Sequence, residues 1–126
     1  MQTKQAVHTQ QAPQPSGTYS QAIKVGNTVY LAGQIPTHPQ TNEMAKGIEA
    51  QVEQVFKNLA AVAEAAGGNL SNIVKLNIFL KDLKDFPVVN STMEKFFTQP
   101  YPARSTIGVA ALPKDSAVEI EGIMVI

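Results

Sequence analysis

The sequence predicts an α+β fold in one domain: a mixed sheet of five or six strands with two helices free to cover one face. Apolar residues recur at three- and four-residue spacing in two segments, which is the period of a helix with one buried face. Elsewhere they alternate or form short runs, as strands do. A length of 126 residues suits one hydrophobic core, so we take residues 1–126 as one domain.

The N-terminal part predicts little regular structure and then a hairpin. Residues 1–16 are rich in glutamine and proline, which favours loose or extended chain with at most a short edge strand over residues 4–8. Residues 22–25 and 28–32 read as two strands, and Gly26-Asn27 between them is a tight-turn signal.

The middle of the chain carries the clearest periodic pattern, a helix of about twenty residues. Gly67-Gly68 supplies its stop signal. Residues 73–80 follow as a strand, with Val74 expected on the same face as Leu76 and Ile78. The apolar face of the helix is expected to comprise Ile48, Val52, Val55, Phe56, Leu59, Val62, Ala63 and Ala66.

A second helix is predicted over about residues 86–97, and the last two strands over about residues 104–110 and 117–126. Several strands carry apolar groups on both faces, for example Phe79 beside Ile78 and Ile123 beside Met124. Since two helices cover only one face of such a sheet, we expect a second copy of the chain to bury the other.

Composition excludes several classes of function. Ten basic residues balance ten acidic ones, so no overall charge favours nucleic acid or an anionic membrane. The sequence has no cysteine, which excludes disulfides, a thiolate nucleophile and the common structural zinc sites. No stretch has the apolar length of a signal peptide core or a membrane span, so we expect a soluble, cytoplasmic protein.

Arg104 is the first candidate for chemistry. Pro100 and Pro102 restrict the chain before it, so the guanidinium would be presented at the mouth of a strand, where its planar fork suits a carboxylate or phosphate. The alternative is a surface cation or half of an ordinary ion pair.

Glu119 is the second candidate, because it lies on a strand that otherwise reads as buried. Desolvation there would raise its pKa toward the range of a general acid or base. The alternative is an ordinary solvated carboxylate, the interpretation we favour for Glu121. In a simple hairpin of the last two strands, Glu119 would face Ala110 and lie roughly 20 Å from Arg104. Either the two strands are not neighbours, or the site combines residues of two subunits.

The remaining candidates have simpler interpretations. His8 and His38 lie in polar, proline-flanked segments without triad or metal-ligand spacing, and we expect surface loops. Tyr19 is either a loop hydroxyl that closes a pocket or a packing residue at the start of a strand.

Several motifs together resemble the Rid (YjgF-type) family of enamine/imine deaminases. The resemblance rests on Tyr101-Pro-Ala-Arg-Ser105, Leu112-Pro-Lys-Asp115 and Val118-Glu-Ile-Glu121, and it extends to Gly17-Thr-Tyr-Ser-Gln-Ala22 and Gly33-Gln-Ile-Pro36. It implies a chorismate-mutase-like fold and a homotrimer with clefts between adjacent subunits. It also implies hydrolysis of 2-imino or 2-enamino acids, such as 2-iminobutanoate and 2-iminopropanoate, to 2-keto acids and ammonia without cofactor or metal.

The resemblance also implies roles for individual residues. Arg104 would hold the substrate carboxylate, and Glu119 would activate water and assist proton transfer to the leaving nitrogen. The cleft would be lined by Tyr19 and Asn90 and bounded by the backbone around Gly33 and Thr106.

This sequence departs from the family pattern at three positions. Thr106 replaces a common cysteine, Ala32 replaces a serine found in several members, and Thr18 replaces a frequent proline. The first two changes put the preferred imine side chain in doubt.

Two rival functions remain open. One is a non-catalytic trimer that binds small carboxylates or acts as a chaperone through the same clefts. The other, ribonuclease or translation inhibitor, has been attached to relatives of the family. It is the weakest here, because the charge is neutral and no histidine pair or aromatic-basic pattern is present.

Overall fold

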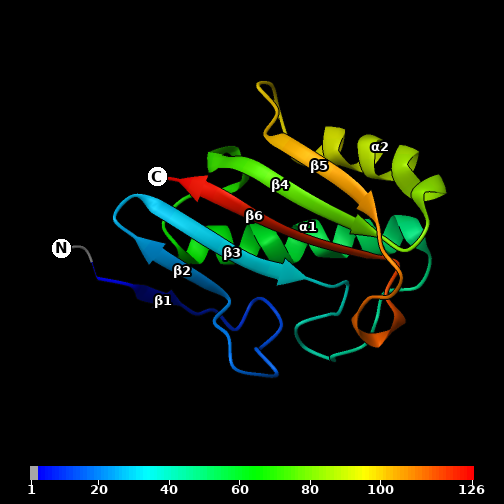
Figure 1. Ribbon diagram of the computed structural model, residues 1–126. Coiled ribbons are helices and arrows are strands. Elements are labelled where there is room, and N and C mark those ends of the chain that lie inside the picture. The colour runs from blue at the N-terminus through cyan, green and yellow to red at the C-terminus, as the bar shows by residue number, and fades with distance from the viewer. Residues whose placement is uncertain (1–2) are drawn as a thin grey trace.

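The computed structural model describes residues 3–126 as one six-stranded sheet with both helices behind the same face (Figure 1). The predicted α+β class and the placement of the helices are therefore confirmed. The strands are β1 (Gln5–Val7), β2 (Ala22–Val25), β3 (Thr28–Gln34), β4 (Ile73–Leu80), β5 (Ala103–Gly108) and β6 (Val118–Val125). The helices are α1 (Ile48–Ala65) and α2 (Phe86–Phe96).

The strand order is β1-β2-β3-β6-β4-β5, so the last two strands of the chain are not neighbours. β6 runs antiparallel to both β3 and β4, while β5 runs parallel to β4. Parallel neighbours need a crossover connection, and α2 supplies it between β4 and β5. The simple hairpin considered above is therefore excluded, and β4 separates the strand of Arg104 from the strand of Glu119.

The core lies between α1 and the sheet. Phe56 on α1 is fully buried and packs edge-on against Phe97, with 5.4 Å between ring centroids. Gly67 ends the helix region with φ of +102°, a conformation that other residues rarely adopt. The largest fully buried side chains are Phe56, Leu59, Leu76, Ile78, Leu80, Ile120, Met124, Val29, Val52, Val55, Val62 and Val89.

One prediction about β4 was wrong. Val74 was expected beside Leu76 and Ile78 in the core, but it is 49% exposed, while Ile73 is buried. The pairing register with β6 shifts between Ile73 and Lys75, where β4 holds one extra residue. Such a bulge turns the inserted side chain out of the alternating pattern.

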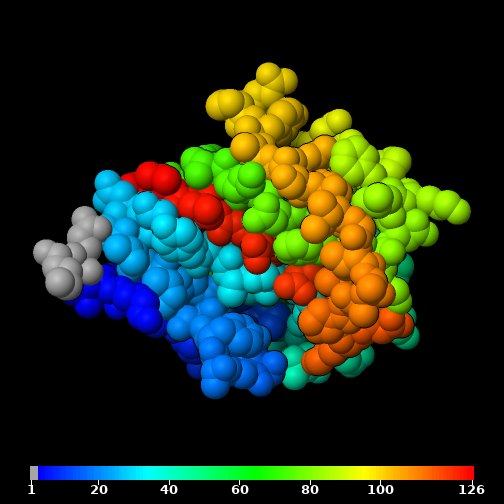
Figure 2. All heavy atoms as spheres, viewed as in Figure 1, coloured from blue at the N-terminus to red at the C-terminus, as the bar shows by residue number. Residues whose placement is uncertain are grey.

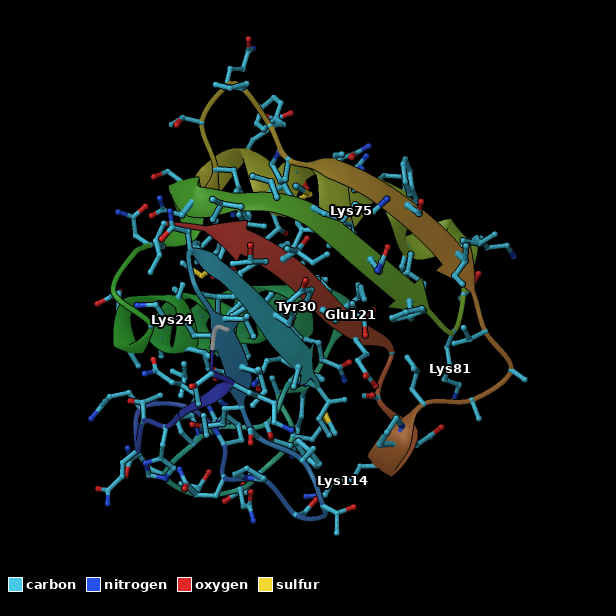
Figure 3. All side chains as sticks on the ribbon, turned by 60° about the vertical axis from the view of Figure 1, so that its left-hand side comes forward. Lys24, Tyr30, Lys75, Lys81, Lys114 and Glu121 are labelled. Carbon is cyan, nitrogen blue, oxygen red and sulfur yellow. The ribbon has the colours of Figure 1, made fainter. Side chains whose placement is uncertain are left out.

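The other face of the sheet, which we call the open face, carries no helix (Figure 1). Tyr30 and Val125 are 52% and 44% exposed there. Figure 3 shows Tyr30, Lys75 and Glu121 standing on this face, from three strands. Apolar and charged groups are thus mixed on a broad surface that the described part of the chain leaves uncovered.

Candidate functional site

Arg104 is held on the helix-covered side of the sheet, at the edge strand β5. In the register with β4 it pairs with Leu76, a core residue, so its side chain leaves the strand toward α2. Nη2 donates a hydrogen bond to Oδ1 of Asn90, and Nη1 lies 3.1 Å from the Met93 sulfur. The guanidinium carbon also lies 5.0 Å from the centre of the Phe86 ring.

These contacts orient the guanidinium without neutralising it. A guanidinium has about five N–H donors, and Asn90 and Met93 each engage one group of them. Arg104 also lines a cavity of about 320 Å³, whose other lining residues include Asn90, Met93, Glu94 and Tyr101. We call Arg104 with its three holding residues the Arg104 half-site. It could bind a small carboxylate in bidentate geometry.

Thr106 lies two residues farther along the same face of β5. Its Oγ1 is buried and has no hydrogen-bond partner among the described residues. Its backbone is better placed for a ligand. Val109, just past the strand, donates its N–H to Leu80 of β4 at 2.9 Å. Successive N–H groups of a strand point to opposite sides, so the N–H of Thr106 points to the free edge.

Glu119 lies on the open face, in the middle of the sheet. It pairs with Phe79 of β4, and Gly33 of β3 lies close to its carboxyl group. A Cβ atom placed on Gly33 would lie 2.2 Å from Oε2 of Glu119, so any other residue here would displace the carboxyl group from its present position. The register of β3 with β6 shifts between Leu31 and Gln34, which marks a bulge at this point.

The surroundings of Glu119 make its carboxyl group harder to ionise than that of an ordinary glutamate. Partial burial raises the pKa of Glu119 above its ordinary value of 4.5, and the neighbouring negative charge of Glu121 raises it further. Glu121 itself accepts a hydrogen bond from Nδ2 of Asn77 at 3.1 Å. A carboxyl group with a raised pKa is a candidate for proton transfer as a general acid or base.

A second, smaller cavity of about 100 Å³ begins at Gly33, and its lining includes Gln14, Tyr19, Gly33, Asn42 and Lys114. In Figure 2 the blue segment near residues 13–20 faces the orange turn near residue 114 across this hollow. Tyr19 is 53% exposed, and its hydroxyl accepts a hydrogen bond from the N–H of Ser16 at 3.3 Å. We call Glu119, Gly33 and this cavity the Glu119 half-site.

Sequence reasoning missed Gln21, which anchors the segment beside Tyr19. Its side chain is 2% exposed. Its Oε1 accepts from the N–H of Thr9 at 2.7 Å, and its Nε2 donates to the carbonyls of Thr9 and Pro13 at 3.0 and 2.9 Å. The only sequence signal was a glutamine at the entry to a strand whose other residues are apolar.

The position of Lys114 was also missed. Lys114 and Asp115 both have φ of +55°, in the left-handed region. That conformation costs about 1–2 kcal/mol for each residue with a side chain. Pro113 next to two polar residues signalled a turn, but nothing in the sequence signalled the left-handed conformation.

A single chain does not bring the two principal candidates together. Arg104 lies on the helix-covered side and Glu119 on the open face. They are two strands and three residues of register apart, a backbone separation of roughly 14 Å at ~4.8 Å per strand and ~3.3 Å per residue. Asn90 and the Thr106 strand edge belong with Arg104, whereas Tyr19 and Gly33 belong with Glu119.

The other sequence interpretations concern simpler features. His8 and His38 are exposed, as expected for surface loops. Within residues 3–126, no three His, Asp or Glu side chains gather into a metal-binding group. Over the same described range, no helix has the length and apolarity needed to cross a bilayer.

Known proteins resemble this chain over nearly its whole length. The family model described as Endoribonuclease L-PSP matches residues 9–126. A protein of Dermatophagoides farinae named 2-iminobutanoate/2-iminopropanoate deaminase is 54% identical over 127 aligned residues, which cover 100% of this chain and 99% of that protein.

Solved structures agree with this likeness. The crystal structure of RidA from the Antarctic bacterium Psychrobacter sp. PAMC 21119 has a TM-score of 0.95 and 52% identity, and the match covers 97% of this chain and 99% of that one. Escherichia coli TdcF with bound serine has a TM-score of 0.93 and 38% identity, with 97% and 98% covered. The chain therefore belongs to the Rid (YjgF-type) family, whose family model carries the description Endoribonuclease L-PSP.

Proposed function

We propose that this protein hydrolyses reactive 2-imino acids, such as 2-iminobutanoate and 2-iminopropanoate, to 2-keto acids and ammonia. The observation that carries the proposal is the 54% identity, from end to end, with a relative named for that activity. The two half-sites supply what the reaction needs, an anion clamp and a proton-transfer group. The reaction proposed here uses no metal or cofactor.

The roles follow from the chemistry of the substrate. A protonated imine carbon is already electrophilic, so orientation and one positioned acid or base account for most of the catalysis required. Arg104 holds the substrate carboxylate with the donors that Asn90 and Met93 leave free. Glu119 takes a proton from the attacking water and returns it to the nitrogen, which leaves as ammonia. The pKa of Glu119, raised by burial, suits both steps.

The remaining candidates bound the substrate. The N–H of Thr106 at the free edge of β5 adds a donor beside Arg104. Tyr19 offers its hydroxyl proton, because that oxygen accepts rather than donates in its bond with Ser16. Gly33 leaves space against the Glu119 carboxyl group. Asn90 both orients Arg104 and lines the cavity in front of it.

The active site is proposed to form between subunits of a homotrimer. Arg104 lies at a free sheet edge and Glu119 on the uncovered face, so one copy would have to set its β5 edge against the open face of the next. Such a head-to-tail contact closes into a ring when the rotation allows it. It would also cover the exposed Tyr30 and Val125. Sedimentation of a monomer at micromolar concentration would contradict this arrangement.

The main alternative is a trimer that binds small carboxylates without turning them over. The relative TdcF, whose structure contains serine, gives this alternative its basis. Saturable binding of a 2-keto acid with no acceleration of imine hydrolysis would favour it.

The decisive assay measures keto-acid release from 2-iminopropanoate generated in place by an amino-acid oxidase. We expect wild type to accelerate release, and Arg104→Ala to lower kcat/KM by about a thousandfold, because a bidentate, preorganised anion contact is lost. Lys95→Ala, a change on the exposed side of α2, is the matched control and should behave as wild type. Near-normal activity in Arg104→Ala would overturn the assignment of the clamp.

A further inference from the structure

The cavity beside Gly33 combines polar walls with one cation. Its lining includes Gln14, Tyr19, Asn42 and Lys114, and none of the described residues that line it is acidic. The one ion pair found within residues 3–126 joins Lys81 to Asp115, so the Lys114 ammonium is not neutralised by a carboxylate there. An uncompensated ammonium in a polar recess favours an anionic ligand group.

Lys114 is an exposed residue that lines this cavity, and two contacts hold the turn that carries it. Asp115 donates its N–H to the carbonyl of Leu112 at 3.1 Å, and its carboxylate pairs with Lys81 at the end of β4. Figure 3 shows Lys81 and Lys114 on different sides of the turn. Because Lys114 and Asp115 both adopt the left-handed conformation, the turn is strained, and the ion pair helps to hold it. Strain maintained beside a cavity points to a use for the residue that it positions.

Gly33 also links this cavity to Glu119. Gly33 lines the cavity, and a Cβ atom on Gly33 would meet Oε2 of Glu119. A substrate whose C2 atom lies at Glu119 would therefore extend its side chain past Gly33 toward Lys114. Asn42 and the hydroxyl proton of Tyr19 are further donors on the way, because no described side chain engages the Asn42 amide and the Tyr19 oxygen acts as an acceptor.

We propose that this cavity is a second anion subsite, which admits dicarboxylic 2-imino acids and binds their distal carboxylate at Lys114. The inference rests on the proposed function and extends its substrate class. With 2-iminobutanedioate, water adds to C2, the C–N bond breaks, and 2-oxobutanedioate and one ammonia form. The two carboxylates of the substrate then bind different cations: Arg104 binds the carboxylate next to C2, and Lys114 binds the distal one.

The test compares kcat/KM for 2-iminobutanedioate and 2-iminopropanoate, each generated in place by the matching amino-acid oxidase. We expect wild type to hydrolyse both. In Lys114→Gln the ratio of dicarboxylate to monocarboxylate kcat/KM should fall about tenfold, the scale of one part-exposed, charge-assisted hydrogen bond. Lys84→Gln changes an exposed lysine that lines neither half-site and is the matched control.

The outcomes separate this inference from the proposed function. Turnover of the monocarboxylate with none of the dicarboxylate would overturn the subsite and leave the deaminase standing, as would an unchanged ratio in Lys114→Gln. Loss of both activities in wild type would overturn the deaminase. In that case the subsite is tested by binding alone: succinate is titrated into the protein, and the NMR chemical shifts of Lys114 and Asn42 are followed. The subsite would be contradicted if succinate caused no shift in wild type, or if the shift of Asn42 persisted in Lys114→Gln.

Discussion

The residues that hold Arg104 come from one continuous stretch, residues 86–104, whereas the groups around Glu119 come from distant parts of the chain. Phe86, Asn90 and Met93 lie one helical turn apart on α2, and all three contact the guanidinium. The Glu119 half-site draws on residues 14–19, Gly33 and the turn at Lys114. A local clamp forms with little loop-closure cost, but the second half-site needs the completed sheet.

Because the two half-sites are built differently, we infer that they contribute differently to the proposed reaction. The guanidinium is fixed by packing before any ligand arrives, which suits binding. The carboxyl group of Glu119 lies close to Gly33 and has a raised pKa. The raised pKa suits a role in proton transfer. Changes to one half should therefore alter different kinetic constants from changes to the other.

The largest expected effect that tests this division is that of Glu119→Gln. Loss of the acid and base should lower kcat by about a hundredfold to ten-thousandfold, with little change in KM. Steady-state kinetics with 2-iminopropanoate measure the split, and Glu43→Gln, an exposed carboxylate in a loop, is the control. A rise in KM as the main effect would mean that Glu119 binds substrate, and the contrast between the halves would fail.

A smaller effect is expected from Gln21→Leu, which frees the segment that borders the Glu119 half-site. The part-buried N–H of Thr9 loses its partner, at a cost of about 1 kcal/mol in stability. We expect kcat/KM to fall about tenfold, because a misplaced site wall weakens orientation. Hydrogen exchange at Thr9 should accelerate in parallel.

The matched control for that change is Val62→Ala, which shortens a fully buried core side chain of α1 that lines neither the Arg104 cavity nor the Gly33 cavity. It should lower stability without lowering kcat/KM. Equal kinetic losses in Gln21→Leu and Val62→Ala would show that Gln21 acts through stability alone and has no positioning role.

The smallest expected effect concerns pH and Glu121. Burial is the main cause of the raised pKa of Glu119, and the charge of Glu121 is the second. Glu121→Gln should therefore move the acidic limb of the kcat profile to lower pH, since Glu119 then ionises more easily. No shift, or a shift to higher pH, would contradict the assignment of that limb to Glu119.

The raised pKa of Glu119 also makes the stability of the fold depend on pH. Folded Glu119 holds its proton to higher pH than the unfolded chain, so its contribution to stability falls as pH rises from the ordinary value of 4.5 through the folded pKa. Glu119→Gln removes this dependence. The variant should therefore gain stability relative to wild type as pH rises through that range, in thermal melts at a series of pH values.

The sequence predicted the elements well and the pairings between them poorly. Helix α1 and strand β4 followed from periodicity, which is a local property. The insertion of β6 between β3 and β4 depends on contacts far apart in the chain, so spacing alone left it open. The same limit hid the bulge at Val74, because one extra residue leaves no local mark.

The candidate site, too, could be predicted only in part from the sequence. Arg104 stood out because two prolines precede it, and Asn90 became a candidate through family resemblance. The role of Gln21 depends on carbonyl groups of a segment that folds back over it, and the direction of Lys114 depends on two left-handed residues. Neither is encoded in a short pattern, so both required the three-dimensional structure.

The placement of Arg104 and Glu119 on opposite sides of one sheet has a genetic meaning. If the proposed ring forms, an Arg104→Ala allele and a Glu119→Gln allele would each give strongly reduced activity alone, yet they would complement each other when co-expressed. In randomly mixed rings about a quarter of the interfaces would join the intact arginine of one copy to the intact glutamate of the next. Activity would then depend on which residues meet at each subunit interface and would not require any single chain to be intact.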